Sequence, residues 1–145
     1  PQWKTPFTEL QVGKGRMILD GNDLAIISIG PIGNTAFEAC LQLAEKNIEA
    51  ALFDIRFLKP IDEELLHSIF KKFNKIITLE DGAIIGGLGS AVTEFASDKG
   101  FLNTTIRRLG IPDRFIEQGT PDELHNECGI DLQGIVNAVE QFLTK

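Results

Sequence analysis

Short apolar runs that alternate with longer, helically patterned segments limit this chain to one main class of fold. The run Leu24-Ala-Ile-Ile-Ser-Ile-Gly30 is almost wholly apolar and ends in glycine, which is typical of a strand buried on both faces of a sheet. Ala50–Ile55 and Lys75–Leu79 repeat this pattern. Strands that alternate with helices favour an open sheet covered on both faces, so we predict an α/β fold with three layers, α/β/α.

Two further segments complete a predicted sheet of five strands. Arg16–Leu19 is a short strand that follows an extended arm, and Thr104–Leu109 is a more polar strand. Because a strand inside such a sheet is apolar on both faces, we expect Thr104–Leu109 to lie nearer an edge.

Apolar spacing and capping residues predict the first helices. Apolar residues recur at helical spacing over residues 36–44, and Asn34 or Thr35 can cap the start of that helix. Asp62 precedes a second pattern of this kind. Its carboxylate is expected to accept hydrogen bonds from the amides of the first turn.

The last part of the chain predicts two consecutive helices. Thr120-Pro-Asp-Glu123 has the form of a capping box with proline at the first helical position. This helix should end at Gly129, because glycine commonly ends helices in the left-handed conformation. The final helix is expected to begin at about Asp131.

Nothing in the sequence divides the chain into several domains. Its 145 residues are the usual length of one domain, and no repeat, linker or low-complexity segment interrupts them. Residues 1–12 are predicted to be a connecting arm from upstream domains that the chain does not contain, and residues 13–145 the domain itself. The chain begins with Pro1 rather than methionine, which suggests a piece excised from a longer protein.

Charge and cysteine content exclude several classes of partner. The formal net charge is −7, and the basic pairs Lys71-Lys72 and Arg107-Arg108 are too short for a surface that binds nucleic acid. No apolar run reaches membrane-spanning length, and the N-terminus has no signal pattern. Cys40 and Cys128 have neither metal-ligand spacing nor a disulfide framework. We therefore expect a reduced, cytoplasmic chain without nucleic-acid or membrane partners.

Two glycine-rich loops between a strand and a helix are candidate anion sites. They are Gly82-Ala-Ile-Ile-Gly-Gly-Leu-Gly-Ser90 and Gly30-Pro-Ile-Gly-Asn-Thr35. Helix N-termini at the carboxyl ends of strands favour anions. Neither loop has the spacing of a dinucleotide fingerprint or a P-loop, so we interpret both as tight turns that allow close helix packing.

Carboxylates, histidines and cysteines offer weaker candidates for a site. Asp54, Glu80 and Asp81 end strands that look adjacent, where carboxylates can hold Mg²⁺ or form a phospho-acceptor pocket. Pairing of Asp54 with Arg56 is the plainer interpretation. Neither His67 nor His125 has a spacing that builds a catalytic triad, so we interpret both as surface or half-buried packing residues. Cys128 is interpreted as a small buried apolar residue rather than a nucleophile.

One segment is too idiosyncratic to follow from core patterning alone, and it carries a family resemblance. It is Gly110-Ile-Pro-Asp-Arg-Phe-Ile-Glu-Gln-Gly-Thr-Pro-Asp-Glu-Leu-His-Asn-Glu-Cys-Gly-Ile-Asp131. With Glu80-Asp-Gly82 and Gly86-Gly-Leu-Gly-Ser90, it resembles the C-terminal domain of the 1-deoxy-D-xylulose-5-phosphate synthases, which are transketolase-type enzymes. The resemblance runs from Gly13 to the final helix. It implies a mixed, mostly parallel five-stranded sheet that packs on the other domains and supports a homodimer.

The resemblance also implies the chemistry of the intact enzyme. Such a synthase condenses pyruvate with D-glyceraldehyde 3-phosphate, with loss of CO₂, in non-mevalonate isoprenoid synthesis, and also feeds thiamine synthesis. Thiamine diphosphate and Mg²⁺ are held by a Gly-Asp-Gly run and a later Asn in upstream domains. Glu80-Asp-Gly82 lacks the leading glycine, so we count it as a partial match by coincidence. We assign no catalytic, cofactor-binding or metal residue to this chain, and expect it to be inactive alone.

Two other interpretations remain open. The chain could be the C-terminal domain of another transketolase-type enzyme, such as transketolase or the β subunit of a 2-oxoacid dehydrogenase. Pro112-Asp-Arg-Phe115 with Gln118-Gly-Thr-Pro121 fits the deoxyxylulose synthase pattern better. A freestanding flavodoxin-like module that binds a small ligand is the more distant alternative. We also expect an apolar docking surface, because Trp3, Phe7 and Leu10 lie in an arm with no core of its own.

Overall fold

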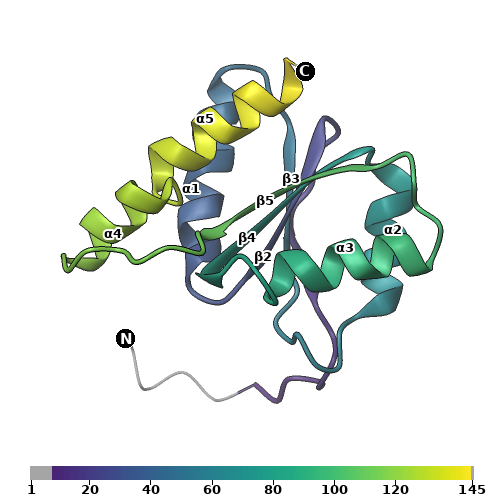
Figure 1. The fold of residues 1–145 in the computed structure, drawn as a ribbon. Coiled ribbons are helices and arrows are strands. Elements are labelled where there is room, and N and C mark those ends of the chain that lie inside the picture. The colour runs from purple at the N-terminus through teal and green to yellow at the C-terminus, as the bar shows by residue number, and fades with distance from the viewer. Residues whose placement is uncertain (1–7, 145) are drawn as a thin grey trace.

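The computed structural model describes residues 8–144, in which five strands and five helices follow one another along the chain (Figure 1). The strands are β1 (Arg16–Leu19), β2 (Leu24–Ile29), β3 (Ala50–Asp54), β4 (Lys75–Ala83) and β5 (Thr105–Ile111). The helices are α1 (Ile32–Glu45), α2 (Glu63–Lys72), α3 (Leu88–Asp98), α4 (Pro121–Cys128) and α5 (Leu132–Leu143).

The strands form a single mixed sheet in the order β1-β3-β2-β4-β5. The pairs β3–β2, β2–β4 and β4–β5 are parallel, and β1 pairs antiparallel with β3. The predicted mixed, mostly parallel five-stranded sheet is confirmed, and the more polar β5 is an edge strand as expected. The expectation that β3 and β4 are adjacent was wrong, because β2 lies between them. Apolar content alone does not reveal strand order.

Helices cover both faces of the sheet and enclose two separate cores. Side chains of α1 and α5 pack on one face with Leu24, Ile26 and Ile77. Side chains of α2 and α3 pack on the other face with Ile27 and Ile76. Figure 1 shows these two helix pairs on opposite sides of the strands. The three-layer prediction is therefore confirmed, and the continuous apolar run of β2 follows from burial on both faces.

The predicted caps at Asp62 and Thr120 form as expected, and Asp131 caps the final helix where that helix was expected to begin. Oδ1 of Asp62 accepts a hydrogen bond from the amide of Leu65 at 3.0 Å, at the start of α2. Thr120 and Glu123 form the complete capping box of α4, which ends at Gly129 with φ of +68°. Asp131 caps α5 by accepting a 2.9 Å hydrogen bond from the amide of Gly134. These caps depend on residues a few positions apart, so the local sequence predicts them.

Two element boundaries differ from the prediction. The helix α1 begins at Ile32, with Pro31 as N-cap and no capping side chain, so Asn34 and Thr35 do not cap it. The strand β4 continues beyond Leu79 to Ala83. This continuation pairs with the end of β5, because Ala83 lies opposite Ile111. Both differences arise from long-range pairing or from turn geometry that apolar spacing does not reveal.

The start of the described chain has no helix or strand before Arg16. Leu10 is half exposed, in line with an arm that lacks its own core, whereas Trp3 and Phe7 lie outside the described residues. The division of the chain at residues 12 and 13 stays a prediction. In residues 8–144, no helix is long and apolar enough to cross a membrane.

Candidate functional site at the carboxyl edge of the sheet

The parallel strands β2, β3, β4 and β5 all end at one edge of the sheet, which we call the carboxyl edge. Ligands in open α/β sheets bind in the crevice beyond this edge. Both glycine-rich loops and all three candidate carboxylates lie here, because they follow or end these strands. The carboxyl edge is therefore where a ligand site has to be sought.

A carboxylate of the chain itself fills the first candidate anion site. The side chain of Glu80 is only 5% exposed and lies against the N-terminus of α3. Its Oε2 accepts a 2.8 Å hydrogen bond from the amide of Leu88, and its Oε1 accepts a 2.9 Å bond from the amide of Gly89. An anion at a helix N-terminus is stabilised by these amides and by the helix dipole. Because Glu80 already accepts from the amides of Leu88 and Gly89, these two amides are not available to a phosphate group.

The glycines of this loop make room for that carboxylate. A Cβ atom at Gly87 would lie 2.6 Å from Cδ of Glu80 and 2.7 Å from the carbonyl oxygen of Ala83. Gly86 adopts a φ of +80°, which favours glycine. The interpretation as a tight turn is supported by this geometry. The capping role of Glu80 was missed, because its partners are eight and nine residues away.

Backbone hydrogen bonds within the second glycine-rich loop, residues 30–35, form a turn. The amide of Gly33 donates to the carbonyl of Gly30 at 3.1 Å, and the amide of Asn34 donates to the carbonyl of Pro31 at 3.0 Å. Next to it, the hydroxyl of the buried Ser28 donates to the carbonyl of Phe53 at 3.1 Å. The first-turn amides of Gly33 and Asn34 are thus already paired, which favours the interpretation as a turn.

Arginine side chains pair with the carboxylate of Asp54. Nε of Arg16 lies 3.3 Å and Nε of Arg56 lies 3.8 Å from Oδ2 of Asp54. The pairing with Arg56 that the sequence favoured is therefore present, and Arg16 adds to it. Since β2 separates Asp54 from Glu80 and Asp81, the three carboxylates do not converge. Over residues 8–144, no three His, Cys, Asp or Glu side chains are grouped as metal ligands.

Asp81 instead contacts α4. Its Oδ2 lies 3.3 Å from Nε2 of His125, and both residues line a cavity of about 240 Å³ together with Cys128. This contact was not predicted, because Asp81 and His125 are far apart in the chain. Cys128 is half-buried rather than buried, which corrects its predicted environment.

The thiol groups lack the character of nucleophiles. Partial burial, followed by the charge of Glu127, raises the pKa of Cys128 above its ordinary value. Burial raises the pKa of Cys40 to about 11. Both cysteines are free, and both thiols stay protonated at neutral pH. The cluster of Asp81, His125 and Cys128 is therefore a contact between a carboxylate and an imidazole beside a thiol, without an activated nucleophile.

His67 packs in an aromatic cluster, as the sequence predicted for a half-buried residue. Its ring lies 5.1 Å from the ring of Phe95 and 5.6 Å from that of Phe101, measured between centroids. Both pairs have the edge-to-face geometry that stabilises aromatic contacts. These contacts give His67 of α2 a role in packing, as predicted, and not in catalysis.

The Glu80-Asp-Gly82 segment does not fit a magnesium diphosphate site. Such a site needs oxygen ligands that converge on the metal and donors that face the phosphates. Glu80 is turned into the protein toward α3, and Asp81 contacts His125. The side chains point to separate partners, so the residues present here would not hold the group.

Comparison with known proteins places the chain in one family. The family described as "Transketolase, C-terminal domain" matches residues 13–135. A 1-deoxy-D-xylulose-5-phosphate synthase of Cytophaga hutchinsonii is 57% identical over 98% of this chain. The enzyme of the same name from Bacteroides fragilis is 51% identical over 94% of it. The chain spans about a fifth of the length of these relatives, 22% and 21%.

Solved structures agree with this assignment. The structure described as "Split gene transketolase, inactive beta4 tetramer" is 33% identical, with a TM-score of 0.87 over 99% of this chain and 46% of that one. A transketolase of Campylobacter jejuni shares the fold, with a TM-score of 0.67 at 12% identity over 93% of this chain and 19% of that one. The family match over most of the chain, together with this fold, shows that the protein belongs to the transketolase C-terminal domain family.

Proposed function

We propose that this chain is the C-terminal domain of a 1-deoxy-D-xylulose-5-phosphate synthase. The observation that carries the proposal is 57% identity over 142 residues to a synthase of that name, including the distinctive segment between β5 and α5. The parent enzyme would condense pyruvate with D-glyceraldehyde 3-phosphate in the cytoplasm, at the start of non-mevalonate isoprenoid synthesis. Thiamine diphosphate and Mg²⁺ would be held by its upstream domains.

Within that enzyme, the role proposed for this domain is structural. It would pack on the upstream domains and support a homodimer. The buried capping role of Glu80 and the pairing of Asp54 support this role, because both carboxylates are engaged by partners within the chain. The function of the domain would then be to position other parts of the enzyme and not to contact substrate.

The test of the parent activity uses the longer protein that contains this chain. Purified protein is supplied with pyruvate, D-glyceraldehyde 3-phosphate, thiamine diphosphate and Mg²⁺, and CO₂ release and the pentulose product are measured. We expect both products in equal amounts, and release that depends on the aldehyde. Failure to consume pyruvate would refute the proposed synthase.

Transketolase activity is a second candidate, because a split-gene transketolase shares 33% identity over nearly the whole chain. The two candidates differ in their donor substrate. A transketolase transfers a two-carbon unit from a ketose phosphate and releases no CO₂. Offering xylulose 5-phosphate and ribose 5-phosphate in place of pyruvate would separate them, since the proposed synthase should not convert this pair.

A further inference from the structure

Several exposed large apolar side chains of residues 8–144 lie at the carboxyl edge. Ile85 is 62% exposed in the loop after β4, and Phe115 is fully exposed in the loop after β5. Leu10 and Val12, which precede β1, are exposed as well. The opposite edge contributes Leu102, in the loop before β5. Ile85 and Phe115 line one cavity, and adjoining exposed apolar groups of this kind mark interaction surfaces.

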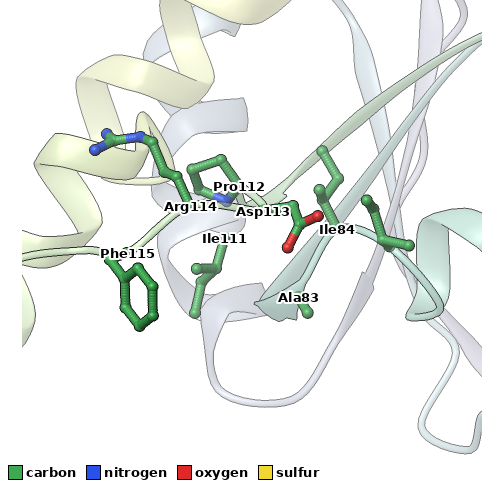
Figure 2. Close-up of a pocket in the computed structure, with 8 residues that line it drawn as sticks. Ala83, Ile84, Ile111, Pro112, Asp113, Arg114 and Phe115 are labelled. Carbon is green, nitrogen blue, oxygen red and sulfur yellow. The ribbon is translucent and has the colours of Figure 1, made fainter.

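The loop that carries Phe115 is anchored so that the aromatic ring projects outward. Nη1 of Arg114 pairs with the carboxylate of Glu127 on α4 at 2.8 Å, and its amide donates to the carbonyl of Pro112 at 2.8 Å. Figure 2 shows the side chains of Arg114 and Phe115 on opposite sides of the loop. A cavity of about 520 Å³ lies here, lined by Phe115 and by residues at the ends of β4 and β5.

The adjoining helix α4 packs only in part on the domain, through Cys128 at its end. None of its residues is buried, although its capping box is complete. Leu124 of this helix, Ile116 and Ile111 line the neighbouring cavity of about 240 Å³. Ile111 lines the cavity beside Phe115 as well, so the two cavities adjoin. A short helix gains most of its stability from packing, and here that packing is incomplete within the chain.

The chain enters the domain at this same edge. Because β1 is antiparallel to β3, its first residue Arg16 lies opposite Asp54, the last residue of β3. The amide of Gly15 donates to Asp62 at 3.0 Å, in the loop that follows β3. In a longer protein, the polypeptide that precedes this domain therefore joins it at the carboxyl edge. That places the preceding chain at the edge that carries the exposed apolar residues.

We propose that Phe115, Ile85 and the two adjoining cavities form a docking surface for the part of the same polypeptide that precedes this domain, an inference that rests on the proposed function. The relatives are about five times longer than the chain, so a large upstream part has to be accommodated. A tethered segment binds at a high effective concentration, so modest apolar contacts suffice.

Charge weighs against a second copy of the domain as the occupant. The exposed segment next to Phe115 carries Asp113, Glu117, Asp122 and Glu123, and Glu123 is retained in the capping box. Arg114 is the basic residue of that segment, and it is paired with Glu127. Two such surfaces placed face to face would bring like charges together, which opposes association.

Thiol labelling tests the docking surface through a reporter beside Phe115. In a Cys128→Ser background, Asp113→Cys places a thiol in the cavity next to Phe115, and Leu102→Cys places a matched thiol at the opposite edge. Maleimide labelling rates are compared between this chain and the longer protein. We expect Asp113→Cys to react at least about tenfold more slowly in the longer protein, and Leu102→Cys to react equally in both.

Adding Phe115→Ser to the Asp113→Cys reporter should restore fast labelling in the longer protein. Equal labelling of Asp113→Cys in both proteins would refute the docking surface. Protection within this chain alone that grows with protein concentration would also refute it, because a second copy would then be the occupant. Synthase activity of the longer protein is measured on the same samples. Labelling rates therefore report on docking, whereas synthase activity reports on the proposed function, so the failure of one can be told from the failure of the other.

Discussion

Two helices begin at the same edge of the sheet, yet their N-termini are completed in different ways. The helix α3 is capped by Glu80, a buried carboxylate from the preceding strand that accepts hydrogen bonds from two of its amides. The helix α1 begins at Pro31 without a capping side chain, and its first-turn amides of Gly33 and Asn34 are paired with backbone carbonyls.

The comparison shows that a helix N-terminus at the carboxyl edge, which could bind an anion, can instead be completed by groups of the chain itself. A helix N-terminus offers amides and a favourable dipole to any anion that reaches it. At α3 the chain supplies that anion itself and leaves no space for another, since Gly87 lies in contact with the Glu80 carboxylate. The N-terminus of α3 is thus occupied by a carboxylate whose hydrogen bonds also stabilise the fold.

Removal of the Glu80 carboxylate should give the largest effect. Glu80→Ala leaves the buried amides of Leu88 and Gly89 without their acceptor, and is expected to lower the free energy of unfolding by about 3 kcal/mol. Urea unfolding measures this loss. The same variant should become more stable on addition of phosphate, unlike the unmodified chain. A loss below about 1 kcal/mol would mean that the cap contributes little.

Substitution of Gly87 should disturb the same contact from the other side. Gly87→Ala forces a Cβ against Glu80, so we expect a loss of about 2 kcal/mol in the free energy of unfolding. In the double variant with Glu80→Ala, the cost of the Gly87 change should fall, because the clash with the carboxylate is gone and only the contact with the Ala83 carbonyl remains. Additive costs in this double-mutant cycle would contradict the proposed reason for the glycine.

Two threonines that the sequence offered as caps should behave differently. Thr120→Ala removes the side-chain acceptor of the α4 capping box and should cost about 1 kcal/mol, whereas Thr120→Ser should cost little. Thr35→Ala is the matched control, and it should stay within about 0.5 kcal/mol because Thr35 caps nothing. Equal losses for the alanine and serine variants at Thr120 would contradict the capping role.

The cap of α2 should make stability depend on acid. Burial by itself raises the pKa of Asp62, but hydrogen bonds from the amides of Leu65 and Gly15 and the charge of Lys14 outweigh it and hold the pKa below its ordinary value. The resulting stability is fully present above about pH 4 and is lost as the pH falls through the lower folded-state pKa.

Asp62→Asn keeps one acceptor oxygen but removes this titration. We expect the substitution to lower the free energy of unfolding by about 1 kcal/mol at pH 7. The difference in this free energy between the variant and the unmodified chain should become smaller as the pH falls from about 5 to about 2. Thermal unfolding at a series of pH values measures the difference. A difference that stays constant over this range would show that Asp62 does not titrate differently in the folded state.

Local patterns predicted most of the fold. The apolar run of β2 indicated burial on both faces, and the spacing from Thr120 to Glu123 indicated a cap, because both depend on neighbouring residues. The family resemblance likewise rested on one continuous stretch of sequence, between Gly110 and Asp131.

The contacts at the candidate site could not be predicted in this way. The contact between Asp81 and His125 joins β4 to α4, and the placement of Asp54 depends on the order of the strands. The cap that Glu80 gives to α3 requires β4 to continue to Ala83, which its pairing with β5 allows. Each of these contacts is set by tertiary structure, and a single sequence carries no direct signal for it.

Calorimetry with thiamine diphosphate and Mg²⁺ tests the central claim that this domain contributes no cofactor site. We expect no measurable heat of binding by the chain alone, because Glu80 and Asp81 are turned to separate protein partners and place negative charge where the diphosphate would lie. Micromolar binding that Asp81→Asn weakens would contradict it.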